Sequence, residues 1–184
     1  MLVDITLKVT PKMRADAGHE RSLNGHLGTH FDVMNKEFPL EFTKREAIVF
    51  DVSRVVDRDI TSEDIDLNRV SANMFVAFYT GFIEKMGYGG ELYFGEHPQL
   101  SDELIDRLLD KGVSMIGIDF AGIRRDPVHP LKDQYCADRG AFIIENLCNL
   151  QQVLARGDGS FTANTYPMNY AELTGLPCRV IAEL

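Results

Sequence analysis

The sequence has no tryptophan, few cysteines and no long hydrophobic run. Its three cysteines, at positions 136, 148 and 178, are odd in number and widely spaced, which fits neither a disulfide framework nor a Cys-x-x-Cys metal site. No apolar stretch reaches the roughly 20 residues that span a bilayer. Asp4 interrupts the apolar N-terminal stretch, and no small-residue cleavage pattern follows it, so a signal peptide is not predicted. We therefore expect reduced thiols in a cytoplasmic protein that does not bind membranes.

Positive charge is also scarce. The chain has 19 Lys and Arg against 28 Asp and Glu, a formal net charge of −9. No basic stripe offsets this excess, so a nucleic-acid partner is not expected, and the acidic balance is interpreted as a contribution to solubility. Hydrophobic residues make up 45% of the 184 residues, which argues for a folded protein and against disorder.

Short apolar runs dominate the chain and predict mostly strands. Alternation or β-rich composition marks residues 3–9, 47–52, 74–79, 113–118, 141–144 and 178–183. Helices are expected after Ser101 and, more briefly, after Thr61, whereas residues 11–25 are polar and irregular and are predicted to form a loop. Strands outnumber helices, and only some connections are helical. The predicted fold is therefore a single α/β domain over residues 1–184, with a mixed, barrel-like sheet flanked by helices.

Three potential metal ligands lie within the string GHLGTHFD, at His26, His30 and Asp32. If the segment is extended, these side chains point the same way, and Gly28 between them leaves room for an ion. Two imidazoles and a carboxylate suit zinc or manganese. The alternative is that the histidines are solvated, or have hydrogen-bond partners in the core, and bind no ion.

The string also resembles the signature of the cyclase family, whose best-known members are bacterial kynurenine formamidases. That signature is His-x-Gly-Thr-His-x-Asp-x-Pro-x-His. Further blocks that look like the family's follow in the family's order: IVFDVS, ITSEDID, YTGF, VSMIGID, FIIENLCNL and LPCRVIAEL. The resemblance covers nearly the whole chain, and it implies the kynurenine formamidase fold, a metal-dependent hydrolase of a small formamide, cyclic amide or lactone, and a homodimer or homotetramer.

The resemblance also implies a ligand set. His26, His30 and Asp32 would bind a divalent metal, Zn²⁺ or Mn²⁺. Many members hold a second ion, which the same aspartate bridges and a later histidine and glutamate complete; the glutamate corresponds to Glu145. In the implied mechanism a metal lowers the pKa of a bound water, which attacks a polarised amide carbonyl. Nearby acids or bases move the protons, and the candidates here are Lys36 and Glu145.

The sequence departs from the family pattern at three positions. Met34 stands for the signature proline, Lys36 for the signature's final, catalytic histidine, and Asp133 for the later metal-binding histidine, twelve residues before Glu145. Lys36 is either a group that stabilises an oxyanion or moves a proton, or a solvated lysine in a protein that has lost the reaction. Asp133 is either a ligand that favours manganese or a loop aspartate without a role. A third alternative is that His129, four residues earlier, turns into the ligand position instead.

The remaining candidates have simpler interpretations. His19 is expected at the surface, His97 in a loop without a role, and Asp119 in a structural position. Glu145 also has a structural alternative, as the partner of an arginine or a backbone amide. Three functions remain open on the sequence: a metal-dependent hydrolase, a binding protein without catalysis, and a dehydratase or true cyclase that uses the metal as a Lewis acid.

Overall fold

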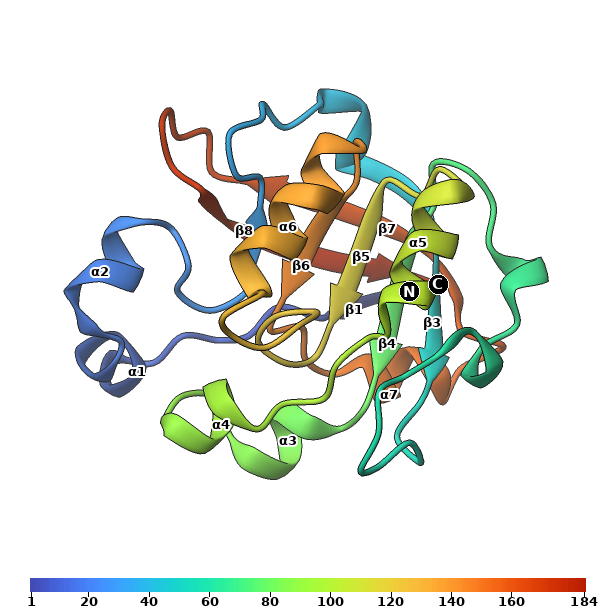
Figure 1. Ribbon diagram of the computed structural model, residues 1–184, viewed down its shortest axis with the longest axis horizontal. Coiled ribbons are helices and arrows are strands. Elements are labelled where there is room, and N and C mark those ends of the chain that lie inside the picture. The colour runs from blue at the N-terminus through green and yellow to red at the C-terminus, as the bar shows by residue number, and fades with distance from the viewer.

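A computed structural model describes the backbone of residues 1–184 and the side chains of 1–17 and 21–184. All strands belong to one mixed sheet, in which β3, β4, β5 and β6 run parallel and the other pairings are antiparallel. The order is β8–β2–β6–β5–β4–β3–β7, and β7 pairs back with β8, so seven strands close a barrel to which β1 adds an eighth (Figure 1). The strands are β1 (Leu2–Asp4), β2 (His30–Asp32), β3 (Lys44–Asp51), β4 (Phe75–Tyr79), β5 (Met115–Ile118), β6 (Phe142–Glu145), β7 (Ser160–Pro167) and β8 (Gly175–Glu183). The predicted mixed, barrel-like α/β domain is confirmed.

Short helices connect and cover these strands. They are α1 (Pro11–Asp16), α2 (Gly18–Leu23), α3 (Phe82–Met86), α4 (Glu91–Gly95), α5 (Asp102–Asp110), α6 (His129–Asp138) and α7 (Leu150–Leu154), with 3-10 turns at Leu40–Thr43, Ser62–Asp64 and Leu67–Arg69. In Figure 1, α5 and α6 lie across the parallel strands, whereas α1 and α2 lie at one side of the barrel. Within the described residues, no helix has both the length and the apolar character that crossing a membrane requires.

The sheet is buried on both faces. Along β4, Phe75 and Ala77 belong to the core inside the barrel, and the alternating Val76 and Phe78 belong to a second core beneath α5 and α6. Because side chains alternate along a strand, a strand covered on both sides becomes a continuous apolar run. This is why the central strands could be predicted from the sequence.

The helix after Ser101 is confirmed as α5. The Ser101 hydroxyl accepts a hydrogen bond from the Leu104 amide at 3.1 Å, and the helix buries one stripe of leucine and isoleucine side chains. Gly112, at a φ of 72°, takes the left-handed conformation that follows the helix end. The predicted start at Thr61 is a single 3-10 turn whose Thr61–Asp64 capping box is present.

The predicted loop over residues 11–25 is wrong, because α1 and α2 occupy most of it. The Thr10 hydroxyl accepts a hydrogen bond from the Met13 amide at 3.2 Å, and Pro11 begins the helix. Helix α1 buries none of its side chains, so it has no apolar stripe to reveal it. The side chain of His19 lies outside the described residues.

Other boundaries were also mispredicted. The first strand ends at Asp4, because the Leu7 amide donates to the Thr29 hydroxyl at 2.8 Å instead of to a neighbouring strand. The segment after residue 128, interpreted as a loop, is helix α6. Strand β7 was missed because only Phe161 is a large apolar residue among its buried positions; the other two are Ala163 and Thr165. A strand end that depends on a hydrogen bond to a side chain, or a strand that buries polar residues, cannot be recognised from hydrophobic periodicity in the sequence.

Candidate metal centre

The pairing of β2 with β6 builds the centre. His30 and Asp32 alternate along β2 and therefore point to the same face. The register places Glu145, the last residue of β6, directly opposite His30. The His30 Nε2 atom lies 3.4 Å from Asp32 Oδ1 and 3.5 Å from Glu145 Oε2. Residues far apart in sequence thus converge at one end of two neighbouring strands.

His26 joins this group through a turn. We expected an extended segment from His26 to Asp32, but the strand begins only at His30, and Gly28 before it has a φ of 73°. The turn nevertheless brings His26 Nδ1 to 3.0 Å from both His30 Nε2 and Asp32 Oδ1. Gly28 does not leave room for an ion, because a Cβ there would lie 2.5 Å from a methyl group of Val9. Its role is conformational.

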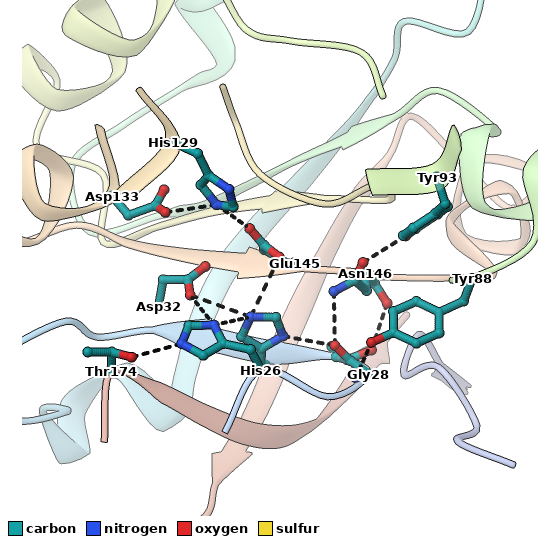
Figure 2. A network of polar contacts seen from close by, with 12 residues as sticks. His26, Gly28, Asp32, Tyr88, Tyr93, His129, Asp133, Glu145, Asn146 and Thr174 are labelled. Atoms are coloured by element: carbon teal, nitrogen blue, oxygen red, sulfur yellow. Dashed lines mark hydrogen bonds and ion pairs between the residues drawn. The ribbon is translucent and has the colours of Figure 1, made fainter. Parts of the chain in front are cut away.

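Hydrogen bonds outside the group orient both imidazoles. The Gly28 carbonyl accepts from His30 Nδ1 at 2.9 Å, and the Thr174 hydroxyl lies 2.8 Å from His26 Nε2 (Figure 2). Each ring is held through one nitrogen, so the other nitrogen faces the centre. Such outer contacts are typical of metal-binding histidines, because they set the tautomer and the ring orientation.

Helix α6 supplies a second group of side chains. His129 and Asp133 are one helical turn apart, so they lie on the same face, and His129 Nε2 is 2.9 Å from both Asp133 Oδ2 and Glu145 Oε1. Asp32, His129, Asp133 and Glu145 offer ligand atoms within 4.8 Å of one another. Asp32 also belongs to the group with His26 and His30. The sequence left Asp133 and His129 as alternatives, and the structure brings both to the centre (Figure 2).

The donor set fits divalent cations. Asp32, Asp133 and Glu145 are only 2%, 3% and 4% exposed, and burying carboxylates together is costly unless positive charge or hydrogen bonds compensate. Yet Asp32 Oδ2 and Asp133 Oδ1 are buried without a hydrogen-bond partner among the described residues. These two oxygens, the imidazole nitrogens and the shared Asp32 form a mixed nitrogen and oxygen set that zinc and manganese accept.

The pKa shifts reflect this concentration of buried acids. Burial lowers the pKa of His30, but the nearby carboxylates, Asp32 above all, raise it to about 9. Burial also opposes the charged form of His129, and hydrogen bonds to Asp133 and Glu145 raise its pKa to about 12. Burial raises the pKa of Asp133 to about 7. Buried carboxylates keep their charged form only beside positive charge, which imidazolium or a metal ion supplies at this position.

The centre opens into a pocket of about 330 Å³, lined by Arg21, Asn24, His26, Phe94, Ala121, Asp126, His129, Glu145 and Asn146. Sequence reasoning assigned no role to Asn146, although it lies in the quoted FIIENLCNL block. Its buried amide donates to the Gly28 carbonyl at 3.0 Å and accepts from the Tyr93 hydroxyl at 2.7 Å. It thereby fixes the turn that positions His26 and His30.

Residues 3–124 match the family model described as “Putative cyclase”. The match spans more than half of the chain and includes His26, His30 and Asp32. The chain belongs to the cyclase family. A comparison with curated proteins found no match.

Solved structures share the fold at low sequence identity. A potential metal-dependent hydrolase with cyclase activity is 22% identical, with a TM-score of 0.77 over 99% of this chain and 96% of that one. A predicted metal-dependent hydrolase from Bacillus stearothermophilus is 20% identical, with a TM-score of 0.73 over 99% and 97%. Isatin hydrolase A from Labrenzia aggregata is 18% identical, with a TM-score of 0.75 over 99% and 93%. These similarities confirm the predicted cyclase-family fold.

Lys36, at the position of the family's catalytic histidine, does not line the pocket at the centre. Its ammonium group lies 2.6 Å from Asp138 Oδ1, its side chain is 37% exposed, and it lines a separate cavity of about 590 Å³ beside the segment from β7 to β8. Neighbouring Met34, at the signature proline, has a φ of 57°. Proline cannot adopt that backbone conformation.

The position of Lys36 leads to a direct test. We expect the Lys36→Met variant to keep its turnover number within about threefold of wild type, because general acid or base catalysis, worth about 10²- to 10⁴-fold, requires contact with the reacting group. Steady-state kinetics on any substrate that the protein turns over measures this. A loss of about a hundredfold would instead show that Lys36 reaches the pocket during turnover and would support its predicted catalytic role.

Two further residues of the sequence analysis, Asp119 and His97, are buried outside the two ligand groups. The buried carboxylate of Asp119 accepts hydrogen bonds from the amides of Thr80 and Gly81 at 2.9 and 2.7 Å, so it anchors the turn after β4. His97 lies in a loop, as expected, but its ring is buried and stacks on Phe120 at an angle of 17°. Burial lowers the pKa of His97 from 6.5 to about 4.

The buried imidazole of His97 predicts a loss of stability in mild acid. Above pH 6.5 the ring is neutral in both states; between that pH and about 4, only the unfolded chain takes up the proton. The free energy of unfolding therefore falls across this interval, by roughly 3 kcal/mol. Urea titrations in the presence of EDTA measure this free energy. The His97→Phe variant has no titrating ring, so its free energy of unfolding should fall over the same interval by roughly 3 kcal/mol less than that of wild type. An equal loss in both proteins would contradict the buried neutral ring.

Proposed function

We propose that this protein is a metal-dependent hydrolase of a small formamide, cyclic amide or lactone. With the amide substrates it cleaves a carbon–nitrogen bond other than a peptide bond. The observation that carries the proposal is the pair of ligand groups that share Asp32, with two buried carboxylate oxygens that have no partner among the described residues. Three members of these groups, His26, His129 and Glu145, line a pocket. The neighbours described as metal-dependent hydrolases support the reaction class. Isatin hydrolase A supports a cyclic amide as one candidate substrate, since isatin is a lactam.

In the proposed centre, one cation would be held by His26, His30 and Asp32, and a second by Asp32, His129, Asp133 and Glu145. The first group has two imidazoles, which suits Zn²⁺, whereas the second has three carboxylates, which favours Mn²⁺. When bound, such a cation polarises a carbonyl and lowers the pKa of water.

The chain's own groups position the ligands and handle protons. The Gly28 carbonyl and the Thr174 hydroxyl hold His30 and His26 in place. Glu145 reaches both groups, with Oε2 toward His30 and Oε1 toward His129, and it also lines the pocket. We therefore assign Glu145 a catalytic as well as a ligand role, in which its carboxylate accepts a proton from the attacking water and returns it to the leaving nitrogen.

A substrate panel tests this function. Protein purified without chelator should hydrolyse at least one of formanilide, isatin, a simple lactam or a lactone. EDTA should abolish turnover, and added Zn²⁺ or Mn²⁺ should restore it. Absorbance and chromatography follow the loss of substrate. A metal-loaded protein that turns over none of these compounds would contradict the hydrolase and favour the binding protein or the Lewis-acid enzyme.

Two properties expected from the sequence remain proposals. All three cysteines are free, and Cys136 and Cys178 are buried, which supports a reducing compartment such as the cytoplasm. A homodimer or homotetramer is proposed from the family resemblance. Light scattering after size-exclusion chromatography measures the assembly directly.

A further inference from the structure

We propose that Arg21 recognises a carboxylate on the substrate, so that the protein hydrolyses N-acylated aromatic acids in preference to neutral amides. The inference rests on the proposed hydrolase and narrows its substrate class. It depends on where Arg21 lies, on what its guanidinium contacts, and on the shape of the space around it.

Arg21 stands where two cavities meet. It lines the 330 Å³ pocket at the metal ligands, and it also lines a neighbouring cavity of about 910 Å³ between α1 and the segment that carries Tyr88 and Phe94. Arg21 and Phe94 are the two residues that border both spaces. A ligand that extends from the centre into the larger cavity therefore passes the Arg21 side chain.

The guanidinium group is held in place and, among the side chains that the structure describes, has no anionic partner. It stacks on the Phe94 ring, with its central carbon 3.4 Å from the ring centroid, and such stacking leaves the N–H donors at its edge free. No described carboxylate forms an ion pair with it. Seven of the eleven other arginines do pair with Asp or Glu: Arg58, Arg69, Arg107, Arg124, Arg125, Arg139 and Arg179. In a chain of net charge −9, an arginine without a carboxylate partner at a pocket mouth is available to an anionic ligand.

The other charged groups explain why such an arginine is needed. Asp126 and Glu145 also line the pocket, and their carboxylates repel an anion. Among the described lining residues, Arg21 is the one Lys or Arg. A planar guanidinium binds a carboxylate through two parallel hydrogen bonds, so Arg21 offsets the repulsion at one defined position. Asp126 on the same wall disfavours anions placed elsewhere.

The shape of the space identifies the rest of the ligand. The pocket at the metal ligands is small and polar, which suits a formyl or similar acyl group. The larger cavity offers Met13, Tyr88 and Phe94, which suit an aromatic ring. The simplest molecule with these parts is 2-formamidobenzoate. In its hydrolysis, water adds to the formyl carbon and the C–N bond breaks; formate and the free aromatic amine form, and one proton is released.

The test compares two substrates that differ in one charge, 2-formamidobenzoate and formanilide. In metal-loaded wild type, kcat/KM should be at least about tenfold higher for the anion. Arg21→Gln should lower kcat/KM for the anion by about 10- to 150-fold, the loss of a charge-assisted hydrogen bond, and for formanilide by less than about threefold. Arg21→Lys should restore part of the preference. Arg14→Gln is the matched control: Arg14 is exposed on neighbouring α1 and lines neither cavity.

The outcomes separate this inference from the proposed function. Equal losses on both substrates, or an anion preference unchanged in Arg21→Gln, would overturn the role of Arg21; an unchanged preference would mean that the carboxylate binds elsewhere. If wild type hydrolyses neither compound nor any member of the wider panel, the hydrolase fails. Calorimetry with 2-formamidobenzoate then still decides the inference, because binding should weaken in Arg21→Gln and remain unchanged in Arg14→Gln.

Discussion

Replacing Asp32 with Asn should empty the metal centre and abolish hydrolysis. Asp32 belongs to both ligand groups, its side chain is buried, and its Oδ2 lacks any hydrogen-bond partner. The amide keeps the shape but carries no charge, so two cations would lose their shared anionic ligand. Wild type should hold about two equivalents of metal and the variant less than about 0.2, with kcat/KM lower by about 10³-fold or more, because metal catalysis contributes several kcal/mol.

Elemental analysis of protein purified without chelator measures this directly. Asp158→Asn is the matched control, since Asp158 is exposed and pairs with Arg69 away from the centre. The control should keep its metal and its activity. His30→Ala is a second variant, and it should lose at least the ion bound by the first group, which consists of His26, His30 and Asp32. Wild-type protein that stays free of metal after incubation with Zn²⁺ and Mn²⁺, or an Asp32→Asn variant that keeps full occupancy, would contradict the assigned centre.

Replacing the helix α6 ligands should remove one ion and leave the other. His129 and Asp133 belong only to the second group, whereas His26 and His30 belong only to the first. We therefore expect His129→Ala and Asp133→Asn each to retain about one equivalent of metal, held by two imidazoles and Asp32. Activity should fall by about 10²-fold or more, because loss of even an outer contact to a metal ligand costs roughly 10- to 100-fold in metal affinity or activity.

The spectroscopic signature of manganese distinguishes the two groups. If the carboxylate-rich group prefers Mn²⁺, protein loaded with one equivalent each of Zn²⁺ and Mn²⁺ should give a protein-bound manganese resonance that disappears in Asp133→Asn. The His26→Ala variant should keep that resonance and lose zinc. Two full equivalents of metal in both α6 variants would show that His129 and Asp133 are not ligands, and that their ion pair only fills the space beside Glu145.

Much of the barrel could be predicted from local pattern. Strands β4 and β5 are continuous apolar runs because they are covered on both faces, and α5 has a serine cap, an apolar stripe and a terminal glycine. Helices α1 and α6 were missed for the opposite reason. Helix α1 buries no side chain, and α6 buries an aspartate and a cysteine beside an alanine. Neither presents the hydrophobic period by which a helix is detected.

The candidate metal centre, like the fold, could be predicted from the sequence only in part. His26, His30 and Asp32 share one short string, so a motif was enough to propose them together. The sequence alone did not decide between Asp133 and His129, since the choice depends on whether residues 129–138 form a loop or a helix. A helix places side chains four residues apart on one face, and both reach Glu145 and Asp32. Arg21 was not predicted at all, because its contact with Phe94 joins segments that nothing in the sequence connects.

By itself, the sequence determined the α/β class, the central strands, the family resemblance and the first three candidate ligands. These features depend on residue type and short-range spacing, which a linear pattern preserves. The tertiary structure alone decided that Lys36 pairs with Asp138 away from the pocket, that Gly28 turns the chain so that His26 can join β2, and that Asp32 serves two ligand groups. Those features depend on strand register and on helix packing across more than a hundred residues, where distance in space is independent of distance along the chain.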